Sequence, residues 1–521
     1  MNWRDMGPEE LGSVYESLLE LVPQITQGGR GFGFATGGET KGNARKTSGS
    51  YYTPDSLVQV LLDSALEPVV QNTISAHPDK PVEALLELSI IDPACGSGHF
   101  LLAAARRLAG HVARLQANGT PSAADYRRAL RQVVGHCVYG VDLNPMAVEL
   151  CKVSLWMEAV EPGLPLTFLD SHIQHGNALL GTTPELMEKG IPDAAWEPIE
   201  GDDKKTASAI KARNKRERTG PSLNLEAPPG SIYARLGAGV RAIDDAEDRD
   251  LAALESKSRQ WSELMSSAGY EQIRFAADLW CSAFVWPKPA TERGVVDPLV
   301  EAAPTHGQFL RIQAGQSRPS GVAVQTVHEL ARRHHYFHWH LAFPQVFARG
   351  GFDVVLGNPP WERVKLQEQE FFASRNMEIA NAATAAHRKK LIAALPQAEP
   401  QLWLEWCAAS RGAEGQSHFI RQSGRYPLCG RGDVNTYAVF AEHNRGVVGP
   451  RGRAGFIVPS GIATDDTTKD YFTGLVDEAR LCSLYDFQSG PGLFGAIGHG
   501  TFKFCLITVA GGRLLAPAQY S

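Results

Sequence analysis

The 521-residue chain lacks the cysteine patterns that mark structural metal sites and disulfide frameworks. Its eight cysteines are scattered between Cys95 and Cys505, and no two of them form a C-x-x-C pair. Structural zinc sites are commonly built on such pairs, and disulfide frameworks belong mainly to small exported proteins. We therefore expect no metal and no disulfide scaffold.

The sequence also lacks any apolar run of the ~18 residues that a membrane span requires. The first residues, MNWRDMGPEELGSVYESLLELV, contain early acidic residues and no apolar stretch ahead of a cleavage site of small residues. This composition argues against a secretory signal. We expect a cytoplasmic protein that has no membrane partner.

An excess of positive charge is missing as well, because the formal net charge is −6 at pH 7. Attraction to a polyanion such as DNA would therefore have to rest on a local basic face. The densest basic run lies at 204–218, and we interpret it as a solvated loop rather than a specific reader of a ligand.

What the sequence does contain is an alternation of short apolar strands and amphipathic helices. The predicted strands are 88–92, 137–141, 172–175, 352–356, 454–458 and a closing antiparallel pair at 481–487 and 501–509. The predicted helices in the first half are 54–72, 99–115 and 145–160. This alternation predicts an α/β fold, a Rossmann-like sheet covered by helices on both faces.

The alternation is interrupted for about 180 residues, where a simple crossover needs only a dozen or more. Two helices are predicted inside the interruption, at 243–267 and 270–285. We interpret it as a mostly helical insertion with a basic loop. The expected organisation is a helix over 7–25 with a Gly-rich linker to residue 50, a cofactor-binding half at 51–181, the insertion at 182–345 and a catalytic half at 346–521.

The first chemical signal is the turn Asp92-Pro-Ala94-Cys-Gly96-Ser-Gly98, which follows a predicted strand and opens a predicted helix. Small residues in such a turn let the backbone approach a ligand, and the N-terminus of the helix favours a negatively charged group. A dinucleotide-binding loop would read G-x-G-x-x-G, and here apolar residues replace the third glycine. The turn therefore differs from the generic dinucleotide-binding loop and is a more specific signal than that loop.

The second signal is Asp142, at the end of the second predicted strand. An acid in this place is suited to accept hydrogen bonds from ribose hydroxyls. The alternative role is to cap the helix that begins at Pro145. Because Asp142 follows the glycine turn in this order, we favour the ribose role.

The third signal is Asn358-Pro359-Pro360-Trp361, directly after the predicted strand FDVVLG. An amide oxygen and a proline carbonyl can accept the two hydrogens of an amino group and free its lone pair from a base ring. The two prolines stiffen the turn, and the indole offers a flat face for an unstacked base. The alternative is a structural loop with a partly buried tryptophan. The order of the three signals favours methylation of an amino group.

These motifs resemble those of adenine-specific DNA methyltransferases of the gamma arrangement. More narrowly, the chain resembles the large methylase subunits of restriction-modification and BREX- or DISARM-type phage-defence systems. The segments that carry this likeness are LGSVYESLL (11–19), SYYTP (50–54), ADLWCSAFVW (277–286), FHWHLAFPQVF (337–347), GRAGFIVPSG (452–461) and LYDF (484–487). The resemblance implies a seven-stranded S-adenosylmethionine-dependent methyltransferase sheet, with double-stranded DNA and a specificity or other defence-system subunit as partners.

The resemblance also implies a role for each matching residue. The residues that would bind S-adenosylmethionine are Tyr52, Thr53, Pro54, Asp92, Ala94, Gly96, Gly98, Asp142 and Asn177. The catalytic residues would be Asn358, Pro359, Pro360 and Trp361. Asn177 occupies a position that is often Asp in the family and that contacts the adenine edge of the cofactor. A target-recognition domain that follows the last strands in the family is expected to be absent.

Two further functions stay open at this stage. The same Asn-Pro-Pro-aromatic motif serves enzymes that methylate protein glutamine or RNA amino groups, and a non-catalytic DNA-binding subunit could retain a vestigial pocket. The run of histidines at 334–340 could suggest a metal, but its aromatic neighbours favour a packed segment. We assign no role to Arg-Gly-Asp-Val-Asn at 431–435.

Overall fold

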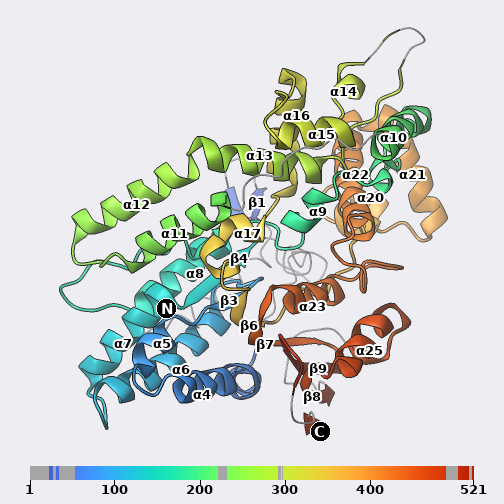
Figure 1. The fold of residues 1–521 in the computed structure, drawn as a ribbon. Helices are drawn as coiled ribbons and strands as arrows, with labels where there is room; N and C mark the ends of the chain where they lie inside the picture. The colour runs from blue at the N-terminus through green and yellow to red at the C-terminus, as the bar shows by residue number, and fades with distance from the viewer. Residues whose placement is uncertain are drawn as a thin grey trace.

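The structure is a computed structural model (Figure 1). It describes residues 23–26, 31–34, 53–220, 231–291, 295, 297–488, 503–514 and 519–520. Across these residues, no helix combines the length and the apolar character needed to cross a membrane.

One mixed sheet forms the centre of the molecule (Figure 1). Its strands are β3 (Ile90–Asp92), β4 (Val138–Asp142), β5 (Ile173–His175), β6 (Phe352–Gly357), β7 (Val448–Pro459), β8 (Leu481–Gln488), β9 (Lys503–Ala510) and β10 (Gln519–Tyr520). They lie in the order β10-β8-β9-β7-β6-β3-β4-β5, in which only β9 runs antiparallel to its neighbours. The predicted Rossmann-like class and the antiparallel closing pair are confirmed, and the two-residue β10 adds an eighth strand to the seven expected.

The order of the strands creates a switch point beside β3. The chain passes from β3 to β4 and β5 on one side and continues with β6 and β7 on the other. Ligands of open parallel sheets bind outside the carboxyl ends of the strands at such a reversal. The topology therefore locates the candidate site at the carboxyl ends of β3, β4 and β6.

Both faces of the sheet are buried, as the continuous apolar strands predict. Neighbouring residues of one strand enter different cores: Ile90 packs with the helices of the first half, whereas Ile91 packs with the insertion and the later helices. The same alternation separates Val354 from Val355 on β6. The helices of the first half are α3 (Asp55–Leu61), α4 (Glu67–Ala76), α5 (Pro81–Leu86), α6 (His99–Gln116), α7 (Ala123–His136) and α8 (Pro145–Glu158), with a π-helical turn at Leu62–Leu66.

The segment between β5 and β6 is mostly helical, as predicted. It contains α9 (Pro184–Glu188), a 3-10 turn (Asp193–Trp196), α10 (Lys204–Thr219), α11 (Ser231–Asp245), α12 (Leu251–Met265), α13 (Ala268–Ser282), α14 (Pro298–Glu301), α15 (His306–Gln313), α16 (Gly321–His334), α17 (Trp339–Ala342) and α18 (Pro344–Phe347). The single helix predicted over 243–267 is wrong, because α11 ends before a break and α12 begins after Asp250, which caps it through Ala253 N–H.

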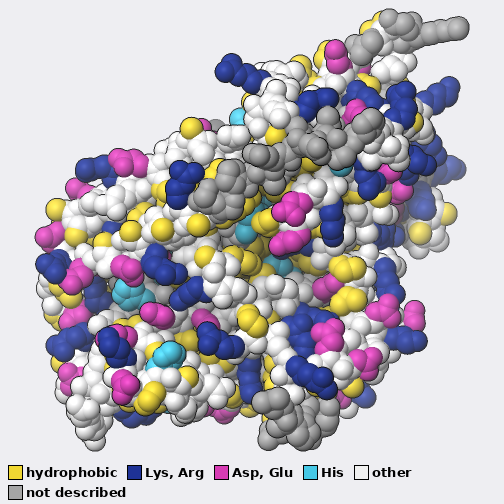
Figure 2. Space-filling model, in the orientation of Figure 1, with side chains coloured by type: hydrophobic (Ala, Val, Ile, Leu, Met, Phe, Trp, Pro, Cys, Tyr) yellow, Lys and Arg dark blue, Asp and Glu magenta, His cyan; other side chains and the backbone are white. Residues whose placement is uncertain are grey.

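The basic run at 204–218 is helix α10, so its interpretation as a loop is wrong. The side chain of Asp203 caps the helix by accepting a hydrogen bond from Thr206 N–H at 2.7 Å. One side of this helix faces the interior and contains the buried residues Ile210 and Asn214, while Lys215 and Arg216 are exposed. Figure 2 shows Lys and Arg side chains gathered over the part of the surface where Figure 1 places α10.

A second set of helices lies between β6 and β7, and of these the sequence indicated only a helix after 431–435 that ends near His443. They are α19 (Glu368–Phe372), α20 (Met377–Ala380), α21 (Ala385–Ala398), α22 (Pro400–Gln422) and α23 (Thr436–Val447). Helices α19 to α22 share a small aromatic core in which the ring of Phe372 stacks on Trp406. After β7 follow α24 (Gly461–Thr464), a 3-10 turn (Asp466–Thr468) and α25 (Lys469–Asp477).

At the N-terminal end the structure describes an antiparallel pair, β1 (Pro23–Thr26) and β2 (Gly31–Phe34). The prediction of a helix over 7–25 and a linker from residue 26 is therefore wrong at these two strands. Residues 7–22 of that predicted helix, and most of the predicted linker, lie outside the described residues.

Candidate active site

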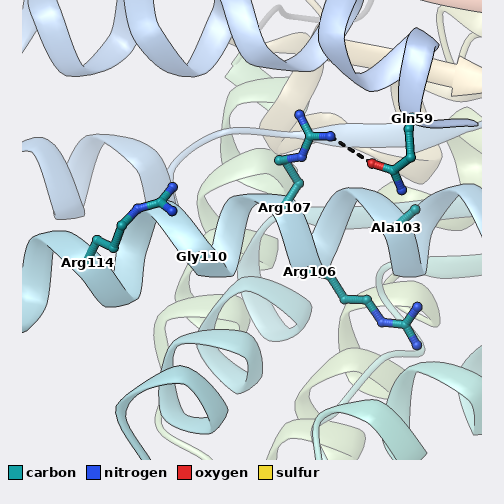
Figure 3. Close-up of a pocket in the computed structure, with 6 residues that line it drawn as sticks. All are labelled: Gln59, Ala103, Arg106, Arg107, Gly110 and Arg114. Carbon is teal, nitrogen blue, oxygen red and sulfur yellow. Dashed lines mark hydrogen bonds between the residues drawn. The ribbon is translucent and has the colours of Figure 1, made fainter. Parts of the chain in front are cut away.

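The site does not coincide with the cavity of about 310 Å³ on the outer side of α6 (Figure 3). Three arginines and Gln59 line that cavity, but Arg106 forms an ion pair with Glu158 and Arg107 forms one with Asp63. The charges of Arg106 and Arg107 are therefore neutralised by neighbouring carboxylates. The candidate residues lie instead at the switch point of the sheet.

The glycine turn after β3 has the backbone geometry that its sequence predicts. Gly96 and Gly98 have φ values of 54° and 91°, in the left-handed region that favours glycine. A Cβ on Gly98 would lie 2.8 Å from the Cys151 sulfur of α8, whereas a Cβ on Gly96 would meet nothing within 4 Å. The turn therefore packs tightly against α8 at Gly98 and leaves open space at Gly96.

Asp142 joins the glycine turn to the end of β4. One carboxylate oxygen accepts a hydrogen bond from Gly96 N–H at 2.9 Å, and the other accepts one from Asn144 N–H at 2.8 Å. The cap of α8 is Asn144, whose side chain accepts a hydrogen bond from Met146 N–H. Asn144, and not Asp142, therefore caps α8. Burial raises the pKa of Asp142 above its ordinary value, against the hydrogen bonds that it accepts.

Asp92 ends β3 and lies beside the start of the Asn-Pro-Pro motif. Its side chain is buried and accepts a hydrogen bond from Ala94 N–H at 3.0 Å. A Cβ on Gly357, the last residue of β6, would lie 2.7 Å from an Asp92 carboxylate oxygen. Burial raises the pKa of Asp92 to about 8, and the nearby charge of Asp142 adds to the rise. The glycine turn and the residue before Asn358 are therefore in direct proximity.

Among the residues that the structure describes, only one end of the Asn358 amide has a hydrogen-bond partner. Its nitrogen donates a hydrogen bond to the Thr53 hydroxyl oxygen at 3.1 Å. Its oxygen is buried and has no hydrogen-bond partner among the described residues. A buried acceptor without a donor is costly, which makes such an atom a candidate for binding a ligand. Thr53 is itself buried and precedes Pro54, the N-cap residue of α3, while Tyr52 lies outside the described residues.

The rest of the motif is fixed to its surroundings. The indole N–H of Trp361 donates to the carbonyl oxygen of Ile457 on β7 at 3.4 Å, and its partly buried ring packs against both main cores. The carbonyl oxygen of Pro360 accepts a hydrogen bond from the Thr436 hydroxyl at 2.6 Å. Thr436 carried no signal in the sequence, because it lies far along the chain from the loop that it contacts.

Asn177 is close to the carboxyl end of β5, but its side-chain oxygen already accepts a hydrogen bond from Leu179 N–H at 3.1 Å. Its backbone N–H donates to the His335 carbonyl oxygen at 2.7 Å, and it forms an isolated parallel bridge with Tyr336. The end of the helical segment therefore returns to the position that we expected to contact the cofactor adenine.

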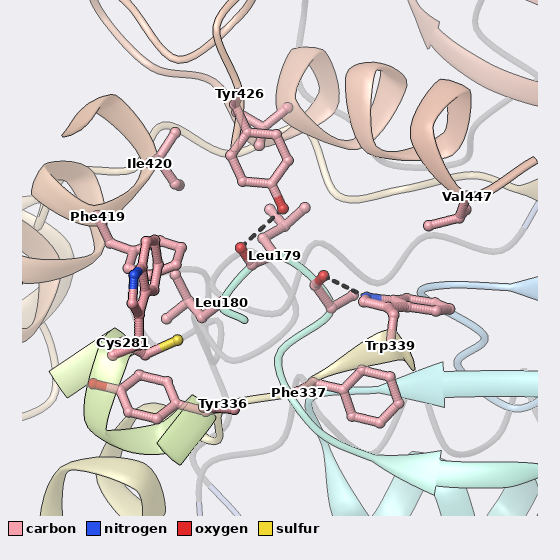
Figure 4. Packing of buried hydrophobic residues seen from close by; sticks show 14 of the residues in the cluster. Leu179, Leu180, Cys281, Tyr336, Phe337, Trp339, Phe419, Ile420, Tyr426 and Val447 are labelled. Atoms are coloured by element: carbon pink, nitrogen blue, oxygen red, sulfur yellow. Dashed lines mark hydrogen bonds between the residues drawn. The ribbon is translucent and has the colours of Figure 1, made fainter. Parts of the chain in front are cut away.

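The histidine-rich run at 334–340 is part of the packed interior. The Nε2–H of His338 donates to an Asp278 carboxylate oxygen at 3.0 Å, and Trp339 donates its indole N–H to the Ala178 carbonyl oxygen. Figure 4 shows the rings of Tyr336, Phe337 and Trp339 around the chain at 179–180. In the portion of the chain that the structure describes, no group of three or more His, Cys, Asp or Glu side chains is arranged as metal ligands.

Two family models match the sequence. The model described as N-6 DNA Methylase matches residues 39–190, which contain the glycine turn and Asp142. The model described as Eco57I restriction-modification methylase matches residues 136–392, which contain Asn358. The two matches together run from residue 39 to residue 392 and include the motifs on which the resemblance rests.

Relatives of known name agree with the models. A Methanocaldococcus jannaschii protein, named as a type II restriction enzyme and methyltransferase on the basis of its sequence, is 22% identical over 400 residues, which are 68% of this chain and 30% of that protein. The adenine-specific methyltransferase PglX of Streptomyces coelicolor is 35% identical over 117 residues, 22% of this chain and 8% of its own. The chain thus spans less than a third of either relative.

Among solved structures, the Type IIL restriction-modification enzyme MmeI in complex with DNA aligns with 99% of this chain and 41% of its own. The sequence identity is 10% and the TM-score is 0.36, which is too low to support an inference. The family models and the named relatives confirm the resemblance that the motifs indicated, to the N6-adenine DNA methylases of restriction-modification systems.

Proposed function

We propose that the chain transfers a methyl group from S-adenosylmethionine to the exocyclic N6 amino group of adenine in double-stranded DNA, as part of a restriction-modification or phage-defence system. The observation that carries this proposal is the side-chain oxygen of Asn358, which is buried, has no hydrogen-bond partner in the described part of the chain, and follows Gly357, which lies against Asp92 of the glycine turn. An amino group of a base that is rotated out of the duplex would supply the missing donor.

The amino nitrogen of adenine is a poor nucleophile because its lone pair is delocalised into the ring. The Asn358 oxygen accepts one amino hydrogen, and a proline carbonyl of the same loop accepts the other. These two acceptors favour a pyramidal nitrogen whose lone pair points away from the ring plane. Thr53 contributes by holding the amide nitrogen, so that the oxygen faces the amino group. The partly exposed ring of Trp361 offers the flat surface on which the base lies.

The residues of the switch point fit S-adenosylmethionine by their geometry and charge. The open space over Gly96 admits a ligand, the acids Asp92 and Asp142 suit its positive charge and its ribose, and Thr53-Pro54 lies at the same end of the sheet. Ala94 and Gly98 complete the turn. When bound, the cofactor supplies an electrophilic methyl group on a positively charged sulfur.

Asn177 has a narrower proposed role than the sequence implied. Its oxygen accepts from Leu179, so the amide nitrogen is the group that remains for the edge of the cofactor adenine. The return of the helical segment at His335 and Tyr336 would form the wall of this end of the pocket. We retain 51–181 and 346–521 as the two halves of the methyltransferase unit, with 182–345 inserted between them.

The test of the proposal is Asn358→Ala. We expect S-adenosylmethionine affinity, measured by calorimetry, to stay within a few-fold of the unaltered protein, while transfer of tritiated methyl groups to unmethylated phage DNA is lost. Parallel reactions with RNA and with a protein extract separate the alternative acceptors. Retained transfer to DNA in Asn358→Ala would contradict the catalytic role, and labelling of RNA or protein alone would contradict the DNA substrate.

Helix α10 is the surface that we propose to contact the phosphate backbone, since Lys215 and Arg216 are exposed on it. The double variant Lys215→Ala/Arg216→Ala should bind duplex DNA more weakly and with a smaller dependence on salt, because each lost phosphate contact lowers the slope by roughly 0.9. The matched control is Arg127→Ala/Arg128→Ala on α7, which removes two exposed arginines elsewhere. Equal effects of the two double variants would contradict a specific role of α10.

A further inference from the structure

The segment at 431–435, to which the sequence analysis assigned no role, lies against the catalytic loop. Val364 N–H donates to the Val434 carbonyl oxygen at 3.0 Å, and Arg363 forms an isolated antiparallel bridge with Asn435. Arg363 also forms an ion pair with Asp433 at 3.4 Å. Two stretches of chain about 70 residues apart in sequence are therefore paired directly after the Asn-Pro-Pro motif.

The centre of this pairing is the hydroxyl of Thr436. It donates to the Pro360 carbonyl oxygen at 2.6 Å and accepts from Glu362 N–H at 2.9 Å. Its oxygen also lies 3.0 Å from the Glu362 carbonyl oxygen, which accepts the Thr436 backbone N–H at 2.8 Å. One threonine thus fixes the backbone on both sides of Trp361.

Helix α23 provides a firm support for these contacts. Thr436 is its first residue, Asn435 caps it through Tyr437 N–H, and most of the helix is buried against the sheet. The backbone N–H groups of a first turn lack partners within the helix, so the Glu362 carbonyl oxygen satisfies one of them. The catalytic loop is therefore tied to a rigid element and not to another loop.

The contact has a chemical consequence for the loop. The Pro360 carbonyl oxygen is engaged in a short hydrogen bond, so of the two proline carbonyls of the motif that of Pro359 remains for the target amino group. Loss of this bond would release the Pro360–Trp361 peptide, which carries the indole ring and is joined to the Pro359 carbonyl through the stiff Pro360 ring. The orientation of the motif therefore depends on a side chain that does not touch the base.

We propose that Thr436 is a positioning residue for methyl transfer, which holds the Pro359 carbonyl and the Trp361 ring in the orientation that the target base requires. This inference rests on the proposed function, because the target base belongs to that proposal. It goes beyond it by assigning the control of the loop to Thr436 at the start of α23.

A first experiment measures the contacts of Thr436 with the catalytic loop and does not depend on enzyme activity. Hydrogen exchange of peptides that contain Glu362 and Val364 should be at least tenfold faster in Thr436→Val, which keeps the shape of the side chain and removes the hydroxyl. Thr436→Ser should restore protection, and exchange in β7 and in the middle of α23 should stay unchanged. Unchanged exchange at 362–364 in Thr436→Val would overturn the inference, and so would loss of protection throughout α23, since that is the result of a structural role.

A second experiment measures transfer. With saturating S-adenosylmethionine and unmethylated phage DNA, the single-turnover rate should fall at least tenfold in Thr436→Val and at most threefold in Thr436→Ser, while cofactor affinity stays within twofold. The control Thr326→Val loses a hydroxyl bond of 2.8 Å to the Val322 carbonyl oxygen on α16 and should keep its rate. If the unaltered protein is active and Thr436→Val keeps its rate, the Thr436 role alone is overturned. If the unaltered protein transfers nothing to DNA, the proposed function fails and the role in transfer falls with it.

Discussion

The single hydrogen bond that orients Asn358 gives the most specific prediction. Thr53→Val keeps the volume of the side chain but removes the hydroxyl oxygen that accepts the Asn358 amide N–H at 3.1 Å. Thr53 is 4% exposed, so water cannot easily replace the lost acceptor. The Asn358 amide can then rotate, because no hydrogen bond to Thr53 keeps its oxygen directed toward the amino group.

The size of the effect follows from the cost of a buried donor without a partner, which is about 1–3 kcal/mol. This cost raises the free energy of the orientation in which the Asn358 oxygen faces the amino group. The rate of transfer should therefore fall by roughly 5- to 150-fold, because about 1.4 kcal/mol corresponds to a factor of ten. Thr53→Ser retains a hydroxyl and should lose at most a few-fold.

The assay is a single-turnover measurement at saturating S-adenosylmethionine, which separates the rate from any change in cofactor affinity. Calorimetry and circular dichroism on the same preparations show whether the cofactor binds and whether the fold is intact. A folded Thr53→Val protein that transfers at the unaltered rate would refute the reasoning. Equal losses in Thr53→Val and Thr53→Ser would refute it as well, since the serine keeps the oxygen.

Three further predictions concern the glycine turn and its acid. Because the pKa of Asp92 is raised to about 8, affinity for the positively charged cofactor should increase as the pH rises through 8, and calorimetry should find this dependence weakened in Asp92→Asn. The raised value also means that Asp92 opposes folding progressively from about pH 4, its unfolded pKa, to pH 8, so denaturant titrations should show Asp92→Asn gaining stability relative to the unaltered protein over that window. Gly98→Ala should destabilise the protein by about 1–3 kcal/mol, because φ is 91° and the new methyl group would lie 2.8 Å from a sulfur atom. Gly110→Ala in the middle of α6 meets nothing within 4 Å and should stabilise by about 0.5–1 kcal/mol in the same titrations, and a reversed order would contradict the packing described.

Local patterns predicted the parts of the fold in which one short segment determines the outcome. The strand endings at Asp92 and Asp142 and the start of α6 at His99 follow from apolar runs, glycines and helix signals that lie within a few residues of each other. Their meeting at one edge follows from the rule that parallel strands carry ligands at their carboxyl ends. The sequence therefore predicted the sheet and the meeting of the glycine turn and Asp142 at one edge of it.

Other features depend on contacts between distant segments. The basic run at 204–218 forms a helix because Asp203 caps it and its apolar side packs inside, although its composition resembles a solvated loop. The side-chain oxygen of Asn177 is engaged by Leu179 at a turn where the helical segment returns, which no motif indicates. Thr436 acts on a loop more than 70 residues away. Such contacts are formed by the tertiary structure, and periodicity alone does not predict them.

The central claim is that an amide oxygen held beside the glycine turn accepts a hydrogen from the amino group of adenine in DNA. The most direct measurement is mass spectrometry of the nucleosides from the DNA of cells that lack other DNA methyltransferases and that express either the unaltered protein or Asn358→Ala. The account predicts N6-methyldeoxyadenosine with the unaltered protein and none with the variant. Methylated cytosine in place of adenine, or equal amounts of methylated adenine in both samples, would contradict it.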